Sequence, residues 1–131
     1  MSIPRPGWRA LAIVLAGAGV LHFVRPRPYA SIVPDALGDP YPWVYASGVA
    51  EIACAAMLLP ARTRRPAAVA TALLFVAVFP ANIQMAADAM SSPRASDVYK
   101  AVSVVRLPLQ VPLVLWAVAV ARRAGRSEAA P

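Results

Sequence analysis

The sequence is poor in the side chains that most catalytic and metal sites require. It has one cysteine, Cys54, one histidine, His22, and six acidic residues among 131. A single cysteine excludes an intramolecular disulfide, a CxxC redox pair and a cysteine-rich metal site. Stable zinc or iron sites use three or four protein ligands, so this set makes a poor metal site. We therefore expect no metal, and no motif for a flavin, haem or nicotinamide or for a catalytic group is visible.

Charge is also scarce. Charged residues make up 15% of the chain and hydrophobic residues 60%, whereas soluble domains carry about 25% charged residues. The apolar residues fall in four blocks separated by proline, arginine and aspartate, which is typical of a multi-pass membrane protein. The net charge of +7 comes from basic residues that flank these blocks. Because no basic amphipathic face or base-stacking motif is present, we expect lipid rather than nucleic acid as the partner.

The four blocks predict an all-α fold, an antiparallel four-helix integral membrane bundle that forms one domain over 1–131. The expected helices span 7–24, 42–59, 66–87 and 101–121, followed by a basic, disordered tail over 122–131. Four prolines exclude a continuous helix between the first two. That connection, 25–41, is expected to lie over the mouth of the bundle, as a passive connector or as a lid.

The distribution of basic residues predicts the orientation in the membrane. With the N-terminus inside, the inner side carries eight basic residues and the outer side four. The inner ones are Arg5, Arg9, Arg62, Arg64, Arg65, Arg122, Arg123 and Arg126; the outer ones are Arg25, Arg27, Arg94 and Lys100. The positive-inside rule then places both termini in the cytoplasm.

Each helix also carries polar residues inside its apolar run, all in the expected outer half of the bundle. They are His22, Glu51, Asn82, Gln84, Arg106 and Gln110. Ionisable groups at this depth are costly unless paired, so we expect an ion pair between Glu51 and Arg106, with Arg106 as the hub. Two interpretations are open: a pair that fixes helix register, or a polar pocket for a ligand headgroup or carbonyl.

The orientation of some of these residues is left open by spacing alone. Asn82 and Gln84 are two residues apart, so their side chains diverge by about 200° in a regular helix. A kink at Pro80 would allow both to face the interior, and otherwise one contacts the loop. His22 is likewise either an interior group or an interfacial residue bonded to a loop carbonyl.

Segments of all four helices resemble the DoxX-like family of small bacterial integral membrane proteins. They are Gly19–Phe23, Ser47–Glu51, Val78–Ile83 and Arg106–Gln110, of which the Phe-Pro-Ala-Asn and Arg-Leu-Pro-Leu-Gln pieces are the most specific. The resemblance implies a four-helix bundle in the bacterial cytoplasmic membrane. Some relatives are subunits of a thiosulfate:quinone oxidoreductase and others are linked to redox-stress complexes, so it implies function only loosely.

The leading hypothesis is a small membrane component of a quinone-linked redox system that binds a quinone or a similar lipid ligand in the outer-half pocket. Because the chain has no redox motif of its own, electrons would come through a soluble or membrane redox partner protein or through the ligand. A second hypothesis is a non-enzymatic scaffold that anchors a partner by its arginine-rich inner face. A small-solute carrier ranks lower, since four helices without repeats offer little for alternating access.

Overall fold

The computed structural model describes residues 7–129, with side chains as far as Arg126, and this part of the chain is all-helical without strands. Arg5 and the last two residues of the tail lie outside the described residues. The elements are α1 (Trp8–Val24), α2 (Pro26–Ala30), the 3₁₀ turn η1 (Asp35–Leu37), α3 (Pro40–Leu58), α4 (Ala61–Ala77), α5 (Phe79–Ser91) and α6 (Asp97–Ala129). The prediction of an all-α fold is confirmed.

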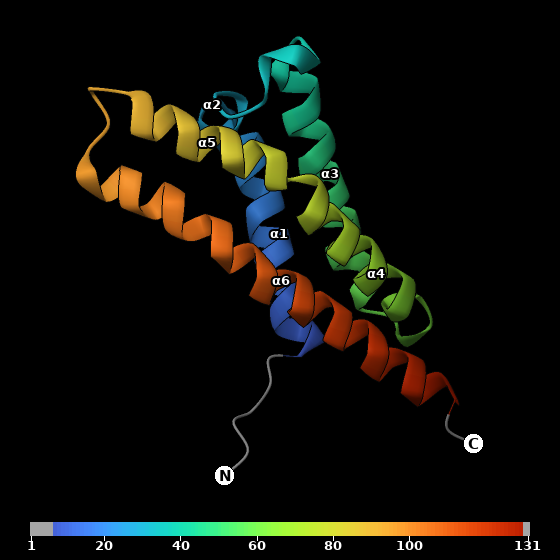
Figure 1. Ribbon diagram of the computed structural model, residues 1–131. Helices are drawn as coiled ribbons and strands as arrows, with labels where there is room; N and C mark the ends of the chain where they lie inside the picture. Colours follow the sequence, from blue (N-terminus) through green and yellow to red (C-terminus); the bar gives the residue numbers. More distant parts are fainter. Residues whose placement is uncertain (1–6, 130–131) are drawn as a thin grey trace.

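The helices pack in two groups, α1 with α3 and α6 with α4 and α5. α1 packs mainly against α3, while α6 packs first against α5 and then against α4. Figure 1 shows the start of α1, the α3–α4 connection and the end of α6 toward one end of the molecule, with α2 and the α5–α6 connection toward the other. We call these the basic end and the far end.

The third and fourth expected helices differ from the structure in their bounds. The segment predicted as one helix over 66–87 is two helices, α4 and α5, divided at Val78. Pro80 stands in the first turn of α5, where its missing N–H breaks the ladder to the preceding turn. α4 also begins at Ala61, five residues before the expected start at Pro66. Pro66 lies in the second turn of α4, where it removes only one backbone hydrogen bond, and the helix tolerates this loss.

The tail expected to be disordered continues the last helix. α6 runs from Asp97 to Ala129, through Pro108 and Pro112. Alanine and arginine, which dominate 121–126, are among the strongest helix formers. This composition explains why the helix passes the point where its apolar run ends.

Side chains fix both ends of α3. At its start, Asp39 accepts a hydrogen bond from the backbone N–H of Tyr41, and Pro40 stands at the first helical position. At its end, Arg64 donates to the carbonyls of Leu58 and Leu59 at 2.8 and 2.7 Å. These bonds satisfy carbonyls that a helix terminus leaves unpaired.

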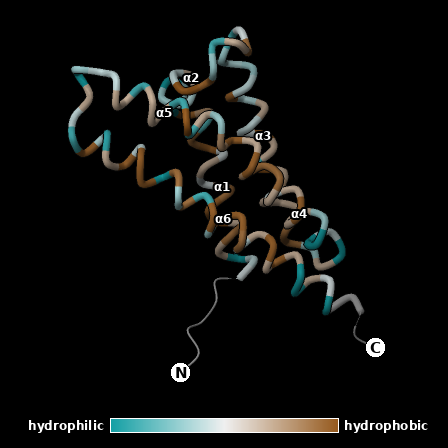
Figure 2. Tube along the Cα trace, viewed as in Figure 1, coloured by the Kyte–Doolittle hydropathy of each residue, from teal (hydrophilic) through white to brown (hydrophobic). Residues whose placement is uncertain are grey.

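Much of the outer surface is apolar. Ile13, Leu73 and Leu115 are 73%, 65% and 61% exposed, and Figure 2 shows hydrophobic residues along the middle of the helices with hydrophilic ones at the connections. By length and composition, two helices could cross a membrane: the kinked helix Ala61–Ser91 and Asp97–Arg126. Trp8–Val24 is a shorter apolar helix.

The buried core is small and rich in alanine. It lies where α1, α3, α4 and α6 meet, and consists of Leu11, Ala12, Leu15, Cys54, Ala55, Leu58, Ala67, Ala68, Phe75, Ala117, Val120 and Ala121. Small residues let helix backbones approach closely. Apart from Thr71, which lies among the core residues of α4, the buried polar groups lie closer to the far end than this core.

Candidate functional site

The site begins at a close crossing of α1 and α3. A Cβ atom on Gly19 would lie 2.9 Å from the carbonyl oxygen of Gly48, and one on Gly48 would lie 2.8 Å from the Cβ of His22. Because only glycine avoids these overlaps, the two backbones can approach here. The crossing brings His22 on α1 next to Glu51 on α3.

His22 and Glu51 form a buried pair with an incomplete set of hydrogen bonds. The Nδ1–H of His22 donates to the carbonyl of Ala18 at 2.7 Å, and the same nitrogen lies 3.1 Å from Oε2 of Glu51. Glu51 is only 9% exposed, and among the described residues its Oε2 has no hydrogen-bond partner. A buried polar atom without a partner costs about 1–3 kcal/mol. The site thus holds a buried carboxylate oxygen that contacts His22 but receives no hydrogen bond from the described residues.

Tyr29, on the short helix α2, covers the histidine. The two rings stack with centroids 3.9 Å apart and an interplanar angle of 19°. Burial raises the pKa of the Tyr29 phenol, and the nearby Glu51 raises it further, whereas Arg106 acts in the opposite direction. The phenol therefore stays protonated at neutral pH and remains a hydrogen-bond donor.

A second polar group surrounds the break between α4 and α5. The amide of Gln110, on α6, donates to the carbonyl of Phe75, a carbonyl that an unbroken helix would pair with the N–H of Phe79. Its oxygen accepts from Nδ2 of Asn82 at 3.2 Å. Gln110 therefore ties α6 to both sides of the break.

The expected ion pair between Glu51 and Arg106 is not formed in the described part of the chain. Glu51 faces His22 instead, and Arg106 is exposed, with its Nη1 3.5 Å from the sulfur of Met85. The reason is the packing: this half of α6 leans on α5 and not on α3. Arg106 lies at the rim of the site and is not its hub.

A cavity of about 290 Å³ connects these groups. Its polar lining consists of His22, Tyr29, Ser47, Glu51, Asn82 and Arg106, and its apolar lining comes from the 31–37 segment, α3 and the α4–α5 break. This volume is at the lower end of the range for small-ligand pockets. A few polar groups converging in an apolar cavity is the arrangement that fixes the orientation of a bound ligand.

Four of the six residues predicted to form a pocket line this cavity. They are His22, Glu51, Asn82 and Arg106. Gln110 lies behind Asn82 and holds it through a hydrogen bond. Gln84 points elsewhere: its amide donates to Asp88 at 2.8 Å on the exposed side of α5. The side chains of Asn82 and Gln84 therefore point in different directions, because both residues lie in the regular helix α5.

The connection between α1 and α3 contributes lining residues that were not predicted. Tyr29 and Ile32 come from it, and Trp43 from the start of α3. The indole N–H of Trp43 donates to the carbonyl of Leu37 at 3.0 Å, and Gly38 adopts a positive φ of 80° that permits the turn beside it. The mixture of prolines and apolar residues in 25–41 was the available signal for a segment that lies over the site.

Comparison with known proteins gives a family but no activity. Residues 11–121, most of the chain, match the family model described as a domain of unknown function (DUF8561). The chain belongs to this family. No match was found among curated proteins or among solved structures.

Proposed function

We propose that this member of the DUF8561 family is a multi-pass membrane protein, similar to the DoxX-like proteins, whose far-end cavity binds a small oxygen-bearing ligand of the quinone class. Its role would be that of a small membrane component of a quinone-linked redox system. In this proposal α1, α3, the kinked pair α4–α5, and α6 are four antiparallel spans in a bacterial cytoplasmic membrane. The basic end faces the cytoplasm.

The apolar exterior supports the membrane part of the proposal. Large apolar side chains such as Ile13, Leu73 and Leu115 are mostly exposed, while His22 and Glu51 are buried. Exposed apolar surface on this scale marks an interaction with lipid or protein. α1 and α3 have 17 and 19 residues, which lies in the range of a spanning helix.

The observation that carries the ligand proposal is Oε2 of Glu51 beside the cavity, which has no hydrogen bond among the described residues and contacts only Nδ1 of His22 at 3.1 Å. A carboxylate accepts a hydrogen bond from a ligand hydroxyl, and a protonated carboxyl donates one to a ligand carbonyl. The Tyr29 hydroxyl and the Arg106 guanidinium line the same cavity and offer further donors to a ligand oxygen. Intramembrane ionisable groups are functional by default because they are costly to keep.

These residues fit the headgroup of a quinone or quinol. The oxygens would be held by Tyr29, Glu51 and Arg106, with Trp43 and Ile32 supplying apolar contact. The bound quinone would supply the redox chemistry, since the sequence carries no other redox motif. The chain's own residues orient the headgroup and hold it in a largely apolar site.

The variant Glu51→Leu tests whether this residue serves a ligand or the fold. Because Oε2 of Glu51 makes no hydrogen bond and His22 keeps its bond to Ala18, the variant loses only the 3.1 Å contact between Oε2 and His22 and should be about as stable as the wild type. It should also lose the quinone that co-purifies with the wild type in mild detergent, as measured by extraction and mass spectrometry. Gln84→Leu, outside the cavity, is the matched control and should retain the ligand.

A purely structural pair predicts a different outcome. Breaking a buried ion pair that stabilises the fold costs about 3–5 kcal/mol, so Glu51→Leu would then lower the thermal midpoint strongly. That result, with no quinone in any of the three proteins, would refute the proposed site.

A further inference from the structure

The basic end of the molecule gathers six arginines from two helices. Arg62, Arg64 and Arg65 stand in the first turns of α4, and Arg122, Arg123 and Arg126 near the end of α6. The two helices pack against each other here. Two hollows lie at this end, and they differ in what their arginines do.

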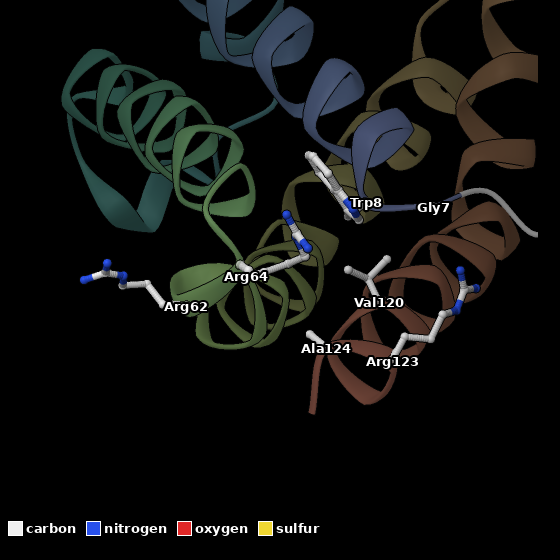
Figure 3. A pocket seen from close by; sticks show the side chains of 8 residues that line it. Gly7, Trp8, Arg62, Arg64, Val120, Arg123 and Ala124 are labelled. Atoms are coloured by element: carbon white, nitrogen blue, oxygen red, sulfur yellow. The ribbon is translucent and has the colours of Figure 1, made fainter. Parts of the chain in front are cut away.

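In the first hollow, of about 430 Å³, an arginine makes contacts that stabilise the fold. The hollow is lined by Trp8, Arg62, Arg64 and Arg123, among others. Figure 3 shows Arg64 extending toward Trp8 while Arg62 points away. The Arg64 guanidinium carbon lies 3.9 Å from the centroid of the Trp8 ring, and this side chain also binds the end of α3. Arg64 thus holds three helices together.

The second hollow is a groove of about 580 Å³ between α4 and α6, and neither Arg64 nor Trp8 lines it. Its mouth is lined by Arg65, Arg122 and Arg126, all exposed. Among the described side chains, no carboxylate lies within 4 Å of their guanidinium groups. Gly125 leaves room for Arg65, whose Nε lies 3.2 Å from where a Cβ would be.

The chemistry of the groove changes along its length. Beyond the arginines its walls are apolar, formed by Val69, Ala72 and Leu73 of α4 and Val118 of α6. The groove thus has cations at one end and apolar walls along the rest. This pattern is complementary to a molecule with an anionic head and a hydrocarbon tail. Free phosphate or an acidic protein surface would use the arginines but not these walls.

We infer that the α4–α6 groove binds an anionic phospholipid, with its phosphate against Arg65, Arg122 and Arg126 and an acyl chain along Val69, Leu73 and Val118. Basic pockets between spanning helices on the cytoplasmic side are suited to such headgroups. The inference rests on the membrane placement proposed above but makes no use of the far-end cavity. The lipid would fasten α4 to α6 at the end where both leave the bilayer.

Lipid titrations of the purified full chain, followed by native mass spectrometry, test this inference. The probes are phosphatidylglycerol and phosphatidylcholine with identical acyl chains. We expect phosphatidylglycerol to bind more tightly, and inorganic phosphate at millimolar concentration to leave its binding largely intact. Equal binding of the two lipids, or full displacement by inorganic phosphate, would overturn the inference without the need for any variant.

Charge removal then locates the site. The triple variant Arg65→Gln, Arg122→Gln, Arg126→Gln should raise the apparent Kd for phosphatidylglycerol about a hundredfold, since each arginine near a membrane surface contributes about fivefold. The matched control removes Arg25, Arg27 and Arg94 at the far end in the same way and should change the Kd little. Equal losses in both triple variants would contradict the inference, as would an acidic partner protein that displaces the lipid from the wild type.

Failure of this proposal and failure of the quinone proposal are distinguishable. Glu51→Leu should leave the phosphatidylglycerol titration unchanged, because Glu51 is not among the residues that line the groove. Conversely, the arginine triple variant should keep its co-purified quinone. Loss of both ligands in either variant would overturn the assignment of two separate sites.

Discussion

At the scale of single residues, the buried polar side chains of the site differ in whether they are hydrogen-bonded. The Nδ1–H of His22 donates to a backbone carbonyl, and Nδ2 of Asn82 donates to Gln110. Gln110 in turn satisfies the carbonyl freed at the α4–α5 break. Only Oε2 of Glu51 is buried without a hydrogen bond among the described residues that line the cavity. This contrast is why we assign ligand binding to Glu51 and positioning to Gln110.

The positioning role of Gln110 can be measured directly. Replacing it with leucine leaves the Phe75 carbonyl and one Asn82 N–H buried without partners, so the variant should lose about 1–3 kcal/mol of stability. Thermal unfolding in detergent, followed by circular dichroism, should show a lower midpoint than the wild type. Gln84→Leu removes an amide of the same size from an exposed pair and should change the midpoint little. If the thermal midpoint of Gln110→Leu equals that of Gln84→Leu, Gln110 does not have the proposed positioning role.

The sequence predicted at which level of the helices the polar residues of the site lie, but it did not predict which residue pairs with Glu51. Depth alone indicated that His22, Glu51, Asn82 and Arg106 would share one level, and all four line the cavity. Charge alone then favoured Arg106 as the partner of Glu51. Which helices touch decides the pairing, and the sequence pattern does not carry that information. The glycines at 19 and 48, which bring α1 to α3, were the signal that favoured His22.

At the scale of elements, the crossing of α1 and α3 positions the site. Gly48→Ala should separate the helices, because its Cβ would lie 2.8 Å from that of His22 and 3.1 Å from the carbonyl oxygen of Gly19. Overpacking of this kind costs about 1–3 kcal/mol, so the thermal midpoint should fall. Quinone retention should fall with it, since His22 and Glu51 move apart.

Gly17→Ala is the matched control for that prediction. A Cβ at Gly17 meets nothing within 4 Å, and alanine is the better helix former by about 1 kcal/mol. This variant should be as stable as the wild type or slightly more stable. If both alanine variants behave alike, the close crossing does not support the site.

The same scale shows why the helix boundaries were predicted less well than the helices. The third helix was expected to start at Pro66, but Pro66 lies inside α4; Pro108 and Pro112 lie inside α6, as they did in the expected helix 101–121. A proline removes one hydrogen bond, and packing of the rest of the helix can offset that loss. In contrast, Pro80 coincides with a true break, where Gln110 compensates for the freed carbonyl.

At the scale of the whole molecule, the two proposed sites lie at opposite ends of the helices, one around the buried Glu51 and the other around exposed arginines. The proposed orientation, with the basic end in the cytoplasm, rests on the positive-inside rule. In a Cys54→Ala background, Pro93→Cys on the α5–α6 connection should react with a membrane-impermeant maleimide in intact cells. Ala61→Cys, at the exposed start of α4, should react only after the membrane is opened. The reverse pattern would contradict the orientation, and reaction of both cysteines in intact cells would contradict the spanning bundle.

The central claim, that the far-end cavity binds a quinone headgroup, is tested most directly by the fluorescence of Trp43, which lines it. Trp8→Phe and Trp116→Phe leave this single tryptophan; the Trp116 indole N–H has no partner to lose among the described residues. Titration with a short-chain quinol should quench Trp43 saturably, and adding Glu51→Leu should raise the Kd about 10- to 100-fold through loss of a charged hydrogen bond. Quenching that never saturates, or that is identical with and without Glu51, would contradict the account.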